Sequence, residues 1–136
     1  MFKIDQETKE IRITRGDIGC IKVQATEEDE ETLYIFKLDD VVRLKVTEAK
    51  NPDNVVLTKD VKVVEEGLDY VKLHLTKTNT KIGELIYKPT KYWYEVELNP
   101  DTNPQTIIAY DEDGPKLFTL YPEGGEGQQW LRLKKP

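Results

Sequence analysis

The side chains that most often perform chemistry in proteins are scarce in this chain. Among 136 residues there is one histidine, His74, and one cysteine, Cys20. His74 alternates with apolar neighbours, which places it on the polar face of a strand, and Cys20 by the same reasoning faces away from the main core. Triads need a histidine beside a nucleophile, and zinc sites gather several such ligands. We therefore expect no histidine-based triad, no metal site and no cofactor.

The carboxylates suggest two further kinds of site. Five acidic residues run together at positions 27–31 (EEDEE). A calcium loop spaces its oxygen ligands and contains a turn glycine, whereas adjacent carboxylates repel one another, so we interpret the run as a solvated hairpin loop. A glycosidase needs two carboxyl groups flanking the scissile bond, and no motif here places such a pair. We expect that the protein is not an enzyme.

Two glycine-containing stretches resemble functional motifs. Arg15, Gly16 and Asp17 match the tripeptide that integrin ligands use. A glycine between two polar residues is also what a tight turn requires, and we interpret the tripeptide as a turn. Neither Gly83 nor the glycine-rich stretch at 124–127 is followed by the lysine and hydroxyl residue of a phosphate-binding loop.

The strand-like segment 92–98 (YWYEVEL) contains the most interesting candidate, Trp93. One face would carry Tyr92, Tyr94, Val96 and Leu98, and the other Trp93, Glu95 and Glu97. If the tyrosine face is the core, Trp93 lies among carboxylates on the wet side and could anchor a partner or stack on a sugar. If the assignment is inverted, Trp93 is the central core aromatic. Trp130 has the same ambiguity. The candidate interaction residues are therefore Trp93, Glu95 and Trp130.

Period-two alternation of apolar and polar residues recurs along the chain. We predict eight to ten short strands, separated by turn signals, and at most one short helical turn, within residues 76–83. The strand-like segments centre on residues 11–13, 21–25, 33–36, 42–46, 55–57, 61–64, 71–75, 92–98, 106–110 and 117–121. This spacing is typical of an all-β sandwich of antiparallel strands.

Composition restricts the class of protein. The length suggests one domain, and the single cysteine excludes an internal disulfide and fits a reducing compartment. A net charge of -6 without a basic patch argues against nucleic acid as a partner, and no apolar run is long enough to predict a membrane span. We assign residues 1–121 to the sandwich and 122–136 to a glycine-rich connector and tail, whose residues 130–133 could pair as a last strand or lie loose.

Several short motifs also occur in a recognisable order. They are Thr14-Arg15-Gly16-Asp17 before the second strand, VVRLKV at 41–46, Leu75-Thr76 with TKIG at 80–83, YWYEVEL at 92–98, DEDG at 111–114 and LFTLYP at 117–122. In this order they resemble the N-terminal immunoglobulin-like domain of the phage baseplate upper protein. The resemblance covers roughly residues 8–122.

The resemblance implies an immunoglobulin-like β-sandwich without catalytic residues. It implies a structural protein of a phage or prophage tail or baseplate, made and assembled in the host cytoplasm and located in the virion. Its partners would be other phage structural proteins and further copies of itself. Baseplate upper proteins continue into long helical and receptor-attachment regions, whereas this sequence ends at Pro136, so we expect a stand-alone module. The alternative is a carbohydrate-binding or adhesin-type sandwich that uses its tyrosine and tryptophan faces.

Overall fold

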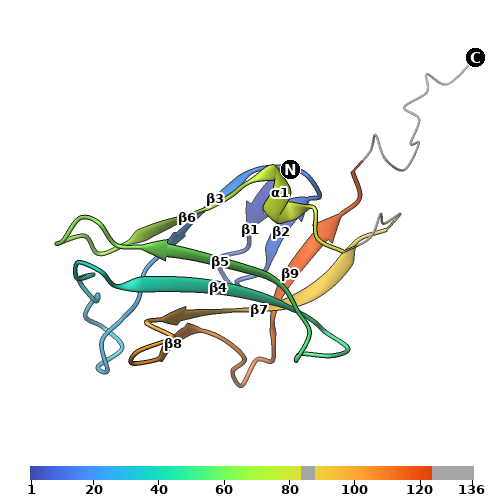
Figure 1. The fold of residues 1–136 in the computed structure, drawn as a ribbon. Helices are drawn as coiled ribbons and strands as arrows, with labels where there is room; N and C mark the ends of the chain where they lie inside the picture. The colour runs from blue at the N-terminus through green and yellow to red at the C-terminus, as the bar shows by residue number, and fades with distance from the viewer. Residues whose placement is uncertain (84–87, 124–136) are drawn as a thin grey trace, which may run out of the picture.

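The fold is built from two β-sheets that face each other (Figure 1). The computed structural model describes residues 1–83 and 88–123, which form nine strands and one short helix, α1 (Lys77–Thr80). The strands are β1 (Phe2–Ile4), β2 (Ile11–Thr14), β3 (Gly19–Val23), β4 (Val41–Glu48), β5 (Val55–Lys62), β6 (Val71–Leu75), β7 (Thr90–Leu98), β8 (Gln105–Ile108) and β9 (Lys116–Tyr121). The predicted all-β sandwich with one helical turn is confirmed.

The larger sheet has the order β1-β2-β9-β7-β4-β5, and the smaller sheet contains β3 and β6. β7 is long enough to serve three neighbours. It pairs with β4 along one edge, while the other edge pairs with β9 in its first half and with β8 in its second half. The order β9-β7-β4-β5 corresponds to strands G, F, C and C′ of an immunoglobulin variable-type sheet, and β3 with β6 to strands B and E.

One strand pair departs from the antiparallel prediction. β2 and β9 run parallel, with Ile11 opposite Phe118 and Thr14 opposite Tyr121. After β2 the chain crosses to the smaller sheet and forms β3, so β3 does not pair with β2. The edge of β2 that does not pair with β1 pairs with the last strand, β9, instead. Parallel pairing is possible because a long stretch of chain connects the two strands. The prediction that all strands are antiparallel is wrong at this position.

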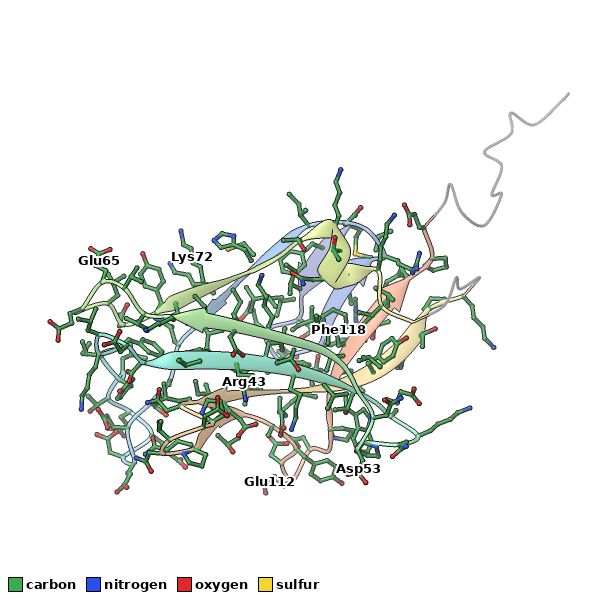
Figure 2. All side chains as sticks on the ribbon, viewed as in Figure 1. Arg43, Asp53, Glu65, Lys72, Glu112 and Phe118 are labelled. Carbon is green, nitrogen blue, oxygen red and sulfur yellow. The ribbon has the colours of Figure 1, made fainter. Side chains whose placement is uncertain are left out.

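The core follows the alternation of the sequence. The inward residues of β4, β6 and β7 are all buried, and they comprise Val42, Leu44, Val46, Val71, Leu73, Leu75, Tyr92, Tyr94, Val96 and Leu98. Phe118 of β9 lies fully buried between the sheets, whereas Lys72 points away from the smaller sheet (Figure 2). Each fully buried leucine contributes about 1.5–3 kcal/mol relative to an exposed one.

Three local predictions need correction. Residues 33–36 form no strand, because Leu33 makes only an isolated bridge to Thr26 and the backbone of Phe36 bonds to the loop at Leu68. Residues 55–62 form one continuous strand, because the segment stays paired with β4 throughout, with Asp60 opposite Arg43. β1 was not predicted because three residues are too few for an alternation signal. Residues 130–133 with Trp130, for which the sequence allows either a last strand or a loose tail, lie outside the described residues, as does most of the predicted tail.

The helical turn α1 has a clear sequence cause. The Thr76 side chain accepts a hydrogen bond from the Asn79 backbone N–H at 3.2 Å, and the Asn79 side chain accepts one from the Thr76 N–H at 2.9 Å. This reciprocal pair is a capping box, which satisfies two donors that a helix start would otherwise leave open. It explains why the polar segment 76–83 forms a helical turn between two strands.

Candidate interaction surface

The structure decides between the two orientations of β7. Tyr92, Tyr94, Val96 and Leu98 are buried, while Trp93, Glu95 and Glu97 are partly exposed on the outer face of the larger sheet. The tyrosine-inward assignment is therefore confirmed, and the alternative that Trp93 is the central core aromatic is wrong. The hydroxyl of Tyr94 donates to the carbonyl of Lys9 at 2.5 Å, which satisfies its polar end inside the core. Burial raises the pKa of Tyr94 to about 12.

Trp93 lies next to a second aromatic ring that the sequence did not place beside it. Its neighbours across the sheet are Thr47 on β4 and Leu117 on β9. The ring of Tyr110, which is 69% exposed, lies with its centroid 6.1 Å from that of Trp93 at an interplanar angle of 56°. Tyr110 follows β8 in the loop that returns to β9. The two rings form an aromatic pair at the surface, within the separation at which such rings attract.

A hollow of about 140 Å³ adjoins this pair, and we name it the Trp93 hollow. Its border includes Trp93, Tyr110, Lys45, Glu95, Pro52 and Pro115. Pockets for small molecules usually measure about 300–1,000 Å³. The Trp93 hollow is therefore sized for one side chain of a partner or for one edge of a sugar, and not for a whole cofactor.

The charges around the Trp93 hollow are already paired within the sheet. Lys45 Nζ lies 2.9 Å from Glu95 Oε1, and this hydrogen bond raises the pKa of Lys45. Further along the same face, Arg43 binds Asp60 at 2.8 Å and Asp101 at 3.0 Å, and both bonds raise the pKa of its guanidinium. Glu95, a candidate from the sequence, thus sits beside Trp93 but in an ion pair. Around the Trp93 hollow, the sheet therefore presents two aromatic rings next to charged side chains that already form an ion pair.

The isolated histidine and cysteine are brought together in a way the sequence did not reveal. Cys20 on β3 and His74 on β6 are cross-strand partners, and both side chains are exposed on the outer face of the smaller sheet. The next pair on the same face is Lys22 opposite Lys72. The predicted outward direction of His74 and Cys20 is confirmed. Within residues 1–83 and 88–123, no cluster of three or more histidine, cysteine or carboxylate side chains could hold a metal ion.

The two loop motifs have local structural roles. The N–H of Asp17 donates to the carbonyl of Thr14 at 2.9 Å, and Gly16 has a φ of +89°, so the predicted turn at residues 15–17 is confirmed. In the acidic run, Asp29 accepts hydrogen bonds from the hydroxyl and N–H of Thr32 and from the N–H of Glu31. These bonds lower the pKa of Asp29 to about 2 and fold the run into the predicted loop, which the Thr26–Leu33 bridge closes.

No protein-family model matches the sequence, and neither a curated protein nor a solved structure shows significant similarity to it. In the part of the chain that the structure describes, no helix has the length and apolar character needed to span a membrane.

Proposed function

We propose that this chain is a non-enzymatic structural protein of a phage or prophage, a tail or baseplate component that acts through protein–protein contacts. The motif order along residues 8–122 supports this proposal, as does the immunoglobulin-like strand order of the two sheets. The observation that carries it is the half-buried Trp93 beside the exposed Tyr110, next to the Lys45–Glu95 ion pair.

That arrangement has the composition of a protein–protein hot spot. Tryptophan, tyrosine and arginine dominate the residues whose loss weakens interfaces, and they act best when a polar rim keeps water out. Here Trp93 and Tyr110 supply the aromatic centre, and the Lys45–Glu95 pair supplies a rim. Because that rim pair is formed before binding, a partner can cover the aromatic rings without leaving a new unpaired charge.

The proposed partners are other structural proteins of the particle and further copies of this chain, and the proposed location is the virion. Closed rings of identical subunits are a common way to build such assemblies. At the far edge of the larger sheet, β5 carries Lys59 and Lys62, and lysine on an edge strand disfavours uncontrolled strand pairing. The proposed docking surface is therefore the sheet face around the Trp93 hollow, and not the β5 edge.

The test combines light scattering after size exclusion, over a wide concentration range, with capture of the products of neighbouring phage genes. We expect a defined oligomer or a specific complex that Tyr110→Ser weakens at least tenfold while leaving the melting temperature within a few degrees. Val64→Ser, at an exposed apolar position away from the hollow, is the control and should change neither. A chain that stays monomeric and captures none of these products would refute the proposal.

A second candidate function is favoured by the shape of the Trp93 hollow. The ring of Tyr110 is exposed, and the neighbouring Glu95 could accept a hydrogen bond from a sugar hydroxyl, as in carbohydrate-binding or adhesin-type sandwiches. A glycan array separates this candidate from the first. Binding that is lost in Tyr110→Ser would favour the sugar-binding function, whereas an array without signal would remove it.

A further inference from the structure

The side of the sandwich where β3 forms the edge of the smaller sheet, here called the open side, has features of a binding site distinct from the Trp93 hollow. β3 pairs with β6 along one edge, and among residues 1–83 and 88–123 no strand pairs with its other edge. At the start of β3, the ring of Phe2 packs against Gly19, where an added Cβ would approach it to 2.7 Å. An unpaired edge leaves backbone N–H and C=O groups available to another chain.

A gap with apolar residues on its core side lies directly beside this free edge. It measures about 350 Å³ and reaches the core between β3 and β8, where Ile21, Val23, Tyr94, Val96 and Ile107 line it. A strand laid on β3 would direct alternate side chains toward this gap, because successive side chains in a strand point to opposite faces. The edge and the gap together satisfy both requirements of strand addition, which are backbone pairing for affinity and a pocket for alternate side chains.

The charge at one end of the gap indicates the chemistry of the occupant. A second hollow, of about 670 Å³, adjoins the gap through the shared residues Ala25, Thr26 and Ile107. Glu27, Glu28 and Asp29 of the acidic loop line it. The gap itself is bordered by the basic residues Lys9 and Lys22. The acidic side chains line only the adjoining hollow, at the end beside the loop. Basic residues of a partner are therefore favoured at that end only.

We propose that the free edge of β3 accepts an extended segment of a partner protein by strand addition. The apolar side chains of this segment enter the gap beside Ile21 and Val23. Lysine or arginine residues at one end of the segment contact Glu27 and Glu28. The site is on the open side of the sandwich, so it is separate from the outer sheet face and goes beyond the proposed function. It would give the domain a second, sequence-selective contact to a neighbour.

The experiment uses the full chain and a fluorescent synthetic peptide, Lys-Lys-Val-Thr-Val-Thr-Val. Binding is followed by fluorescence anisotropy, and the location of binding by amide hydrogen exchange. We expect saturable binding and roughly tenfold slower exchange at residues 20–26, with no change along β5. A peptide with glutamate in place of both lysines is the matched control and should bind at least tenfold more weakly.

Two protein variants test the geometry. The double variant Glu27→Lys, Glu28→Lys should reverse the preference between the two peptides, since both side chains are exposed and their replacement leaves the core intact. Ala25→Phe, which would place a ring in the gap, should abolish binding while the protein stays folded by circular dichroism. The proposal is overturned if neither peptide binds, if the preference is unchanged in the double variant, or if protection appears along β5 instead of β3.

Discussion

The hydroxyl of Thr80 in α1 donates a hydrogen bond of 2.7 Å to the carbonyl oxygen of Asp17 and accepts one of 3.0 Å from the N–H of Gly16. A fully buried side chain thus fastens the turn between the two sheets to the helix that precedes β7. The turn at residues 15–17 therefore serves as a structural anchor, and the Asp17 carboxylate is engaged with the amino group of Met1. This environment differs from that of a tripeptide displayed on a free loop for a receptor.

Thr80→Val should destabilise the protein by about 1–3 kcal/mol, because valine has nearly the same shape but leaves the partly buried N–H of Gly16 and carbonyl of Asp17 without this partner. Thr80→Ser keeps the hydroxyl and should recover most of that loss. Chemical denaturation of the three proteins measures the difference. Equal stability of the valine and serine variants would show that the two hydrogen bonds contribute nothing.

Two glycines with positive φ provide a matched pair for backbone strain. Gly67 has a φ of +91° and nothing within 4 Å of an added Cβ, whereas Gly83 has a φ of +70° and an added Cβ would lie 2.7 Å from the hydroxyl oxygen of Tyr92. Gly67→Ala should cost about 1–2 kcal/mol from the left-handed backbone alone. Gly83→Ala should cost clearly more, because the buried Tyr92 must also move. A thermal melt showing the opposite order would contradict the contact between Gly83 and Tyr92.

The sequence was informative where one face of a strand is buried and the other is wet. The alternation in β4, β6 and β7 predicted which residues lie in the core, because a strand with period two has only two choices of face. It left the choice open at Trp93, where both faces of β7 carry large aromatic residues. Burial in the structure settles it in favour of Tyr92 and Tyr94.

Local sequence patterns could not predict the contacts between distant segments. Nothing in the stretch around Ile11 indicates that its strand will pair in parallel with β9, and nothing near Trp93 indicates that Tyr110 will return beside it. The free edge of β3 is likewise a property of the whole topology. Cys20 and His74 became neighbours only through the β3–β6 register. These features depend on how the chain crosses between sheets, which pattern and propensity do not encode.

Core truncations on opposite sheets should be severe. Leu44 of β4 and Leu73 of β6 are both fully buried, and replacing either with alanine should cost about 2–4 kcal/mol through lost apolar burial and the remaining cavity. Val64→Ala, at a side chain that is 82% exposed, should stay within about 0.5 kcal/mol of the wild type. Urea titrations that show similar losses at all three positions would contradict the assignment of the core.

Asp40 should make the fold sensitive to acid. Its buried carboxylate accepts hydrogen bonds from the Tyr34 hydroxyl at 2.7 Å, the Lys37 N–H at 2.9 Å and the Asn99 side-chain amide at 3.0 Å. Burial alone raises the pKa of Asp40, but the hydrogen bonds from Asn99, Lys37 and Tyr34 outweigh it, so the pKa lies below its usual value of 3.8. The ionised carboxylate of Asp40 therefore links the loop that contains Tyr34 and Lys37 to Asn99, which directly follows β7.

A carboxyl group whose pKa is lower in the folded state stabilises the protein above its unfolded pKa, and this contribution is lost as the pH falls through the folded value. For Asp40 the loss should begin near pH 5 and continue below 3.8, the usual value from which its pKa is lowered. Asp40→Asn should cost about 1–3 kcal/mol at neutral pH, since the amide cannot accept all three bonds. The wild type should then lose more stability than the variant between pH 5 and pH 3, measured by urea denaturation at each pH. If the two proteins lose stability in parallel over that range, the Asp40 carboxylate is not the acid-sensitive tie between the loop and β7.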